Sequence, residues 1–210
     1  AATPQRERKK FVAADRDVAA ARRTLDLDPD RTVVVVFAGS LGSRRINEAT
    51  AAAARTLATR RDLSIRHVVG ARDWDRREQV VTDGLDYTQI RYEHDMATVL
   101  AAADLAVCRA GGTTVAELAV IGVGSVLVPL PIATRDHQTA NAQPLVRAGA
   151  AVLVPDAERL VAEVLAIVDA PDRDGRARTD EMASAARSLG RPDAAAEVAD
   201  LVETHASRPS

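Results

Sequence analysis

Short runs of β-branched apolar residues alternate along the chain with alanine-rich stretches in which apolar positions recur every three or four residues. The run TVVVVFA (32–38) is apolar on both of its faces, which is typical of a central strand in a parallel sheet. The recurring positions instead predict helices that pack on such a sheet. The apolar runs predict strands at 32–38, 63–70, 87–92, 104–109, 125–130 and 150–155. The recurring positions predict helices at 12–27, 43–58, 74–81, 96–103, 113–121, 136–148 and 156–169.

The regular alternation of predicted strands and helices indicates an α/β fold, a Rossmann-like parallel sheet with helices on both faces. We expect this domain to occupy residues 12–190. The chain has no initiator methionine and opens on a linker-like Thr-Pro. These features suggest the second part of a longer protein, with residues 1–11 as the remnant of a linker. Residues 191–210 are expected to form a separate C-terminal helix and tail.

The last predicted helix has an apolar stripe of its own. Pro192 opens it, because proline is favoured in the first turn of a helix. Its apolar residues then recur at helical spacing, at Ala194, Val198, Leu201 and Val202. This stripe either covers the domain's own sheet or packs against a partner domain outside this chain, and the pattern favours neither interpretation.

Composition narrows the class of protein. The net charge of -2 and the aromatic content of 2% argue against a nucleic-acid-binding surface, which needs clustered positive charge and stacking side chains. Cys108 is the only cysteine, so no intramolecular disulfide can form, and this fits a reducing compartment. No apolar run approaches the roughly 18–20 residues that span a bilayer, and the first residues lack the apolar core of a signal peptide.

Ligands of an open parallel sheet bind beyond the carboxyl ends of its strands, so the loops at this edge are the candidate site. The first loop lies within FAGSLGSRRIN (37–47). Gly39 and Gly42 permit positive φ angles and close approach of the backbone. They either serve only a tight turn from strand to helix, or they let Ser40 and the N–H groups of the next helix donate to a phosphate. The loop is not the dinucleotide fingerprint, and Gly70 stands where a ribose-binding acid would end the second strand. A nicotinamide-dependent dehydrogenase is therefore disfavoured.

The second loop, RAGGTT (109–114), leaves the fourth predicted strand. Gly111 and Gly112 leave the backbone N–H groups unshielded. Either Thr113 or Thr114 can cap the following helix or offer a hydroxyl group to an anion. Arg109 can pair with a phosphate or with a surface carboxylate.

Glu117 follows this turn, and its carboxylate has two interpretations. It is either a capping-box glutamate that reaches back to a threonine cap, or an acceptor for two hydrogen bonds from a vicinal diol such as that of ribose. Cys108, which directly precedes Arg109, is most simply a small buried residue, because no histidine or lysine in the sequence is placed to activate it.

The third loop runs through PLPIATRDHQTANAQPL (129–145) into a helix. Asp136 is expected to cap that helix. Gln138 and Asn141 are three residues apart and share one helix face, and their amides carry both donors and acceptors, which suits sugar hydroxyl groups. The histidines show no metal-ligand spacing, so a metal-dependent reaction is disfavoured. The one within a strand, His67, is expected to be structural.

Together these motifs resemble the second half of the MurG family of GT-B glycosyltransferases, which add N-acetylglucosamine to the lipid-linked muramoyl-pentapeptide precursor of peptidoglycan. The resemblance covers essentially the whole chain. Its motifs are similar to Thr3–Arg6, Ala38–Gly42, Asp95–Met96, Cys108–Glu117 and His137–Ala142. Ala38 replaces a glycine of the family pattern, and Gly124 stands where a proline is usual. Neither change removes a side chain that the site needs.

The resemblance implies a donor-binding domain for UDP-N-acetylglucosamine, with no cofactor and no metal. Glu117 would bind the ribose, and the turn at Gly111–Thr114 would bind the diphosphate together with Ser40. Gln138 and Asn141 would bind the sugar. The backbone near Met96 would bind the uracil edge. The full expected binding set is Arg6, Gly39, Ser40, Gly42, Met96, Arg109, Gly111, Gly112, Thr113, Thr114, Glu117, Gln138 and Asn141.

The family's N-terminal domain is not in this chain, and the resemblance places the catalytic base, the lipid acceptor site and a peripheral contact with the cytoplasmic face of the bacterial membrane there. No catalytic residue can be named in these 210 residues. Two alternatives stay open. A UDP-N-acetylglucosamine epimerase would share the fold and the ribose-binding glutamate. A non-catalytic module would bind the nucleotide sugar alone.

Overall fold

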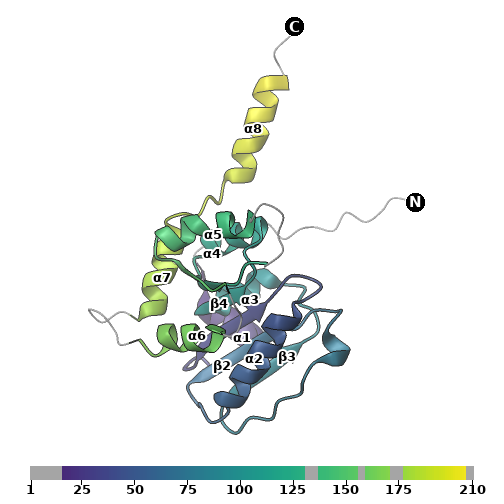
Figure 1. Cartoon of the computed structure of the whole chain (residues 1–210). Helices are drawn as coiled ribbons and strands as arrows, with labels where there is room; N and C mark the ends of the chain where they lie inside the picture. Colours follow the sequence, from purple (N-terminus) through teal and green to yellow (C-terminus); the bar gives the residue numbers. More distant parts are fainter. Residues whose placement is uncertain (1–15, 131–136, 156–158, 171–176, 207–210) are drawn as a thin grey trace.

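The computed structural model describes residues 16–130, 137–155, 159–170 and 177–206. Six parallel strands form one sheet in the order β3-β2-β1-β4-β5-β6 (Figure 1). This is the order of a doubly wound fold. Successive strands are added on one side of β1 up to β3, and from β4 onward they are added on its other side. The strands are β1 Thr32–Phe37, β2 Leu63–Val68, β3 Asp86–Ile90, β4 Leu105–Cys108, β5 Gly124–Leu127 and β6 Ala151–Leu153.

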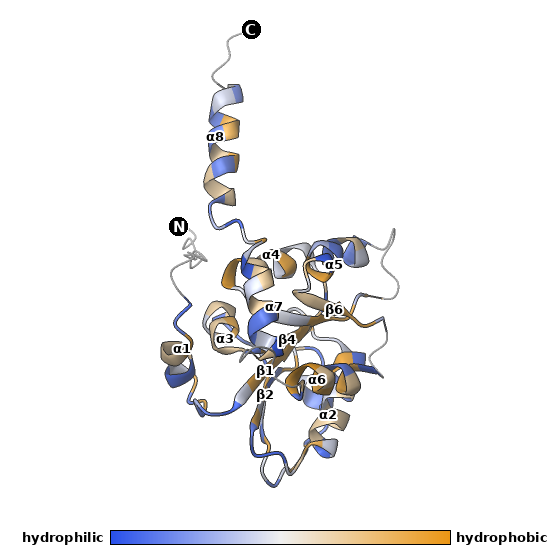
Figure 2. Ribbon diagram, turned by 90° about the vertical axis from the view of Figure 1, so that its left-hand side faces the viewer, coloured by the Kyte–Doolittle hydropathy of each residue, from blue (hydrophilic) through white to orange (hydrophobic). Residues whose placement is uncertain are grey.

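Helices cover both faces of the sheet, which confirms the predicted fold class. One apolar cluster joins one face of the sheet to α3, α4 and α5, and a second joins the other face to α2 and α6. Figure 2 shows hydrophobic residues concentrated on the strands between these helices. The helices are α1 Val18–Thr24, α2 Arg44–Thr56, α3 Met96–Ala102, α4 Gly112–Ile121, α5 His137–Arg147, α6 Leu160–Val168, α7 Arg178–Arg187 and α8 Ala194–Ala206.

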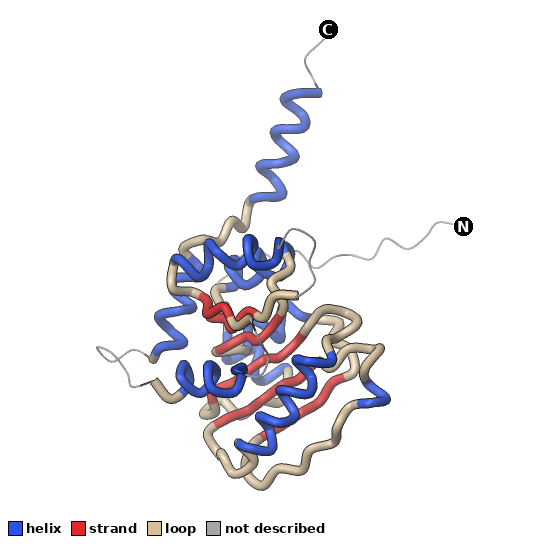
Figure 3. The backbone as a smooth tube through the Cα atoms, in the orientation of Figure 1, coloured by secondary structure: helices blue, strands red, loops and turns tan. Residues whose placement is uncertain are grey.

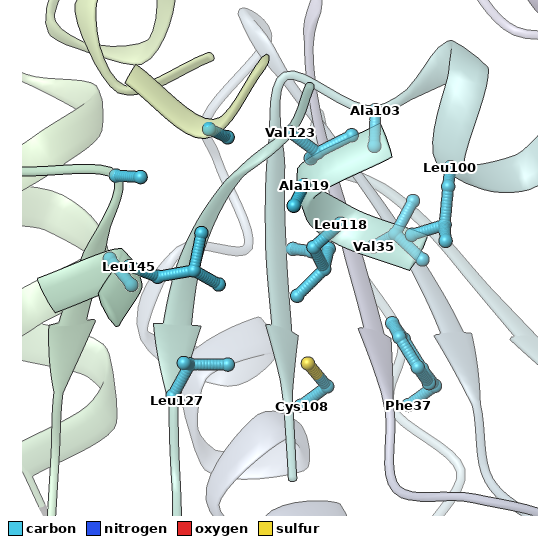
Figure 4. Close-up of a cluster of buried hydrophobic side chains, with 14 of the residues drawn as sticks. Val35, Phe37, Leu100, Ala103, Cys108, Leu118, Ala119, Val123, Leu127 and Leu145 are labelled. Atoms are coloured by element: carbon cyan, nitrogen blue, oxygen red, sulfur yellow. The ribbon is translucent and has the colours of Figure 1, made fainter. Parts of the chain in front are cut away.

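Cys108 ends β4 inside the first of these clusters (Figure 4). Its thiol lies among Phe37, Leu118 and Leu127, and the residue is fully buried. Burial raises the pKa of the Cys108 thiol far above its usual range, and the nearby charge of Glu117 adds to this effect. Cys108 is therefore a packing residue, as its sequence context predicts.

The prediction of a helix at 74–81 is wrong. Only Trp74–Arg76 forms a short 3-10 helix, named η1, and Arg77 already has an extended backbone. The Arg77 guanidinium lies 3.6 Å from the Trp74 ring centroid, and Gln89 on β3 donates a hydrogen bond to the carbonyl oxygen of Glu78. The hydrogen bond from Gln89 ties the segment to the edge strand, and in a helix the Glu78 carbonyl oxygen would instead accept from within its own segment.

Helix α8 extends away from the sheet (Figures 1 and 2). Its apolar stripe is open to solvent, with exposed fractions of 59% for Val198, 60% for Leu201 and 62% for Val202. The interpretation that this helix covers the domain's own sheet is therefore wrong, and packing on a partner domain stays a prediction. Neither α8 nor any other helix in the described residues is long and apolar enough to cross a membrane.

His67 lies on β2 and is 1% exposed. Its Nδ1 is 2.9 Å from the Tyr87 hydroxyl group on β3, and its Nε2 is 2.9 Å from Oδ1 of Asn47 on α2. Burial lowers the pKa of His67 to about 4, so the ring is neutral near pH 7. The expectation that His67 is structural is confirmed in its burial and its internal hydrogen bonds.

This buried ring should make stability sensitive to acid. In the unfolded chain the pKa of His67 returns to 6.5. Between pH 6.5 and about 4 the unfolded state therefore binds more protons, and the free energy of unfolding falls as the pH falls. For this one group we expect a loss of about 2 kcal/mol between pH 7.5 and pH 5. Urea unfolding at both pH values should show a drop that is smaller by this amount in His67→Gln, and equal drops in the two proteins would contradict the prediction.

Candidate functional site

The candidate site lies where the strand order switches from one side of β1 to the other, at the carboxyl ends of β1, β4 and β5. Figure 3 shows these strands in one sheet, with connecting loops at their ends. Arg109, just after β4, joins the three loops. Its Nη2 donates to Oγ of Ser43 at 2.7 Å, and its Nη1 donates to the carbonyl oxygens of Val128 at 3.0 Å and Pro129 at 2.6 Å. The three loops predicted from the sequence are therefore brought together, and Arg109 holds them in place.

These three hydrogen bonds of Arg109 end on neutral oxygens rather than on a surface carboxylate, which was one of its two predicted partners. Burial lowers the pKa of Arg109, and repulsion from Arg45 lowers it further. Positive charge is thus concentrated at this edge of the sheet.

The loop after β1 depends on its glycines. Gly39 and Gly42 have φ angles of +80° and +83°, a region that favours glycine. A side chain at Gly42 would overlap the carbonyl oxygen of Val69, whereas a Cβ at Gly39 would meet nothing within 4 Å. Ser43 is the N-cap residue of α2, but its hydroxyl group makes no capping hydrogen bond. The first N–H groups of α2 are therefore not capped by that side chain, and exposed Ser40 lies in the same loop.

The loop after β4 leads into α4 one glycine earlier than predicted. Gly111 is the N-cap residue, with an extended backbone and no side chain to accept a hydrogen bond. The prediction that Thr113 or Thr114 caps the helix is wrong, because Gly112 is already helical and both threonines lie in the first turn. The first N–H groups of α4 therefore lack a side-chain cap.

Glu117 is five residues beyond Gly112, the first residue of α4, and so lies in the second turn. The capping-box interpretation is wrong, because that position for a Gly111 cap is Thr114. Burial raises the pKa of the Glu117 carboxyl group. Among the residues that the structure describes, no hydrogen bond or ion pair engages this carboxylate. Its role as an acceptor for a ribose diol stays a prediction.

The third loop brings two amides to the same edge. Gln138 accepts a hydrogen bond from the N–H group of Leu130 at 2.9 Å, and Asn141 donates to the carbonyl oxygen of Ala110 at 3.1 Å. Asn141 therefore connects α5 to the loop after β4. Among the described residues, the Gln138 NH2 group and the Asn141 side-chain oxygen have no hydrogen-bond partner. The predicted cap Asp136 lies outside the described residues, as does Arg6.

Met96 begins α3, next to the N-cap residue Asp95, which accepts the N–H group of Thr98 at 3.2 Å. The Glu93 carboxylate accepts the N–H groups of His94 and Asp95. The side chain of Met96 packs against the apolar cluster. Its backbone is thus held at the start of a capped helix, while the predicted contact with a base stays untested.

Two features of the site have no counterpart in the sequence predictions. The first is the hydrogen bond between Ser43 and Arg109, residues that are 66 positions apart. The second is the charge at the start of α2, where Arg44 and Arg45 fill a first turn that contains no acidic residue. A helix N-terminus ordinarily favours negative side chains. Two arginines in the first turn are therefore an unusual feature of the sequence that could have drawn attention to this helix end.

The sequence from residue 33 to residue 201 matches the family described as the glycosyltransferase family 28 C-terminal domain. The chain belongs to this family. The match includes all six strands except the first residue of β1, as well as the three loops of the candidate site.

Curated relatives agree with this membership. The chain is 46% identical over 173 residues to the UDP-N-acetylglucosamine–N-acetylmuramyl-(pentapeptide) pyrophosphoryl-undecaprenol N-acetylglucosamine transferase of Nitratidesulfovibrio vulgaris, covering 81% of this chain and 47% of that protein. It is 40% identical over 187 residues to the enzyme of the same name in an Exiguobacterium species, covering 89% of this chain and 51% of that protein. The chain therefore spans about half the length of the curated relatives it matches.

Solved structures give the same result. The crystal structure of Acinetobacter baumannii MurG has a TM-score of 0.74 and 30% identity, covering 89% of this chain and 53% of that one. The predicted resemblance to the second half of MurG is confirmed. A proposed UDP-N-acetylglucosamine 2-epimerase of Listeria monocytogenes has a TM-score of 0.63 but only 17% identity, over 90% of this chain and 48% of that one. That likeness shows a shared fold alone.

Proposed function

We propose that this family 28 domain binds UDP-N-acetylglucosamine as the donor half of an enzyme that transfers N-acetylglucosamine to undecaprenyl-diphospho-muramoylpentapeptide. One observation carries the proposal. The starts of α2 and α4 lie at adjacent strand ends, neither has a side-chain cap, and Arg109 links the loops that precede them. Two helix N-termini side by side form an anion site, and the diphosphate of the donor is the anion that fits.

The same groups account for the chemistry expected of the donor half. When the bond between the sugar and UDP breaks, negative charge grows on the diphosphate. The N–H groups of α2 and α4, Arg44 and Arg45 are positive groups that stabilise this charge without a metal ion. We propose that the acceptor hydroxyl attacks from the opposite face of the sugar, which inverts the anomeric centre.

The ribose, the N-acetylglucosamine and the uracil of the donor each have a candidate partner at the carboxyl edge of the sheet. Half-buried Glu117 would accept hydrogen bonds from the ribose hydroxyl groups. Gln138 and Asn141 would bind the sugar through the amide groups that have no hydrogen-bond partner among the described residues. The backbone at Met96 would bind the uracil edge, and Ser40, Thr113 and Thr114 would add hydroxyl donors to the diphosphate.

The acceptor site, the catalytic base and the contact with the cytoplasmic face of the membrane are proposed to lie in the part that the relatives have beyond this chain's span. We propose residues 1–11 as the linker to that part and 12–190 as the donor-binding domain. Residues 191–210 are the C-terminal helix and tail. The exposed stripe of α8 would then pack against the second domain, burying Val198, Leu201 and Val202.

Titration calorimetry of the 210-residue chain with UDP-N-acetylglucosamine tests the proposal. We expect binding, with an affinity that changes by less than about threefold between excess chelator and millimolar magnesium. A radiolabelled donor with a soluble acceptor analogue should give no transfer, and no UDP-N-acetylmannosamine should form. A folded chain that binds nothing at millimolar donor would refute the assignment as a donor domain. Formation of the mannosamine product would favour the epimerase alternative.

A further inference from the structure

A chain of hydrogen bonds runs from the edge strand β3 to the loop after β1. Gln89 donates to the Tyr87 oxygen at 3.0 Å, and Tyr87 meets Nδ1 of His67 at 2.9 Å. Nε2 of His67 meets Oδ1 of Asn47 at 2.9 Å. Asn47 then donates through Nδ2 to the carbonyl oxygen of Val69 at 3.1 Å and to the Asp73 carboxylate at 3.2 Å.

The partners fix the direction of every bond in this chain. The Val69 carbonyl and the Asp73 carboxylate are acceptors only, so the Asn47 NH2 group must face them and its oxygen must face His67. His67 therefore carries its proton on Nε2, and Nδ1 accepts from the Tyr87 hydroxyl group. One tautomer of a buried neutral ring thus determines the orientation of Asn47.

Asn47 holds the carbonyl oxygen of Val69, and the Val69–Ala71 segment packs directly against the loop after β1. The missing side chain of Gly42 would overlap the Val69 carbonyl oxygen, and that of Gly70 would overlap the backbone of Gly42. The Ala71 N–H group donates to the carbonyl oxygen of Ser40 at 3.3 Å. Backbone packs on backbone here, so a shift of residues 69–71 moves the loop with it.

We propose that His67 is a positioning residue for diphosphate binding, acting through Asn47 and the Val69–Ala71 segment on the Gly39–Ser43 loop. The inference rests on the proposed function, because it concerns the same anion site. It predicts a specific loss. Removing the Nε2 donor should weaken the binding of ligands that contain the diphosphate. The binding of ligands that contain only the nucleoside should change little.

Two substitutions of His67 separate this role from a general effect on folding. Glutamine places an NH2 group at the depth of Nε2 and keeps the donor to Asn47, whereas asparagine reaches only the depth of Nδ1 and loses it. We expect His67→Asn to lower the affinity for UDP on the order of tenfold, the effect of one lost hydrogen bond. The affinity for uridine should fall by less than about threefold. His67→Gln should restore most of the UDP affinity. Binding can be followed by chemical-shift titration of the labelled 210-residue chain.

A second pair of variants keeps the test decisive if His67→Asn does not fold. Tyr87→Phe removes the hydroxyl group that His67 contacts. Ser64→Ala removes another part-buried side-chain hydrogen bond between β2 and β3, from Ser64 to Asp86 at 2.9 Å, toward the amino end of the strands. Tyr87→Phe should lower the ratio of UDP affinity to uridine affinity, and Ser64→Ala should leave this ratio unchanged.

The outcomes distinguish the two proposals. If the unmodified chain does not bind UDP, the proposed function fails. If it binds UDP, but His67→Asn loses equal factors for UDP and uridine or loses nothing, the positioning role of His67 is refuted. A long-range proton–nitrogen spectrum of the imidazole should show the proton on Nε2 at pH 7, and a proton on Nδ1 would also refute the role.

Discussion

Gly42→Ala is expected to reduce UDP affinity by on the order of a hundredfold, equivalent to about 2.7 kcal/mol. The residue has a φ angle of +83°, and a methyl group there would overlap the carbonyl oxygen of Val69. That oxygen is held by Asn47 and cannot move away without breaking a hydrogen bond. The loop itself must therefore shift, and the N–H groups at the start of α2 shift with it. Charge-assisted hydrogen bonds to a diphosphate depend on this geometry.

Gly149→Ala is the matched control. Gly149 has a φ angle of +77°, but a Cβ there would meet nothing within 4 Å, and the residue lies in the turn between α5 and β6. Both variants pay the strain of a positive φ angle, about 1–2 kcal/mol, in the stability of the fold. Only Gly42→Ala should lose UDP affinity in calorimetry. Similar affinities for both variants would show that the loop after β1 does not bind the diphosphate.

The sheet could be predicted from the sequence because its strands are buried on both faces. Parallel strands covered by helices read as continuous apolar runs, and Val33–Phe37 and Leu105–Cys108 are all buried. The positions of the site loops followed from the strand ends. Of the glycines that the sequence singled out, Gly39 and Gly42 have positive φ angles, and Gly111 and Gly112 form the start of α4.

The sequence could not predict how the helices begin. Threonine and glycine are about equally favoured as N-cap residues, and a threonine hydroxyl group can also accept a hydrogen bond, so Thr113 and Thr114 were reasonable candidates. The structure starts α4 at Gly112 instead. Asn141 holds the carbonyl oxygen of Ala110 from α5, a contact between residues 31 positions apart, and no local pattern contains that information. The wrong cap also made Glu117 look like part of a capping box.

Segments that depend on tertiary contacts were predicted less well. A helix was predicted at 74–81, but the hydrogen bond from Gln89 on β3 to the Glu78 carbonyl oxygen holds the segment against the edge strand instead. For α8 the helical period correctly predicted a stripe, because periodicity shows that a face is apolar. It cannot show what covers the face, and Figure 1 shows α8 away from the sheet.

Glu117→Ala should weaken UDP binding by about 1.5–3 kcal/mol, which corresponds to a loss of roughly 10- to 150-fold. The carboxylate is half-buried, and no other group in the described residues engages it, so a ligand that donates two hydroxyl groups would gain charge-assisted hydrogen bonds. A UDP analogue that lacks both ribose hydroxyl groups should bind the variant and the unmodified chain with similar affinities. Calorimetry with the two ligands measures this difference.

The control for this change is Glu181→Ala, which removes a helical glutamate whose partner is Arg178 in the first turn of α7. It should leave the affinity for both ligands unchanged. The pKa of Glu117 gives an independent test, because burial raises it in the free protein, whereas hydroxyl donors favour the ionised form. Bound UDP should therefore lower the pKa of Glu117, and carboxyl carbon shifts in a labelled sample can follow this change. A pKa that stays the same on binding, or an equal loss of affinity for UDP and its analogue, would mean that Glu117 supports the helix and does not contact the ribose.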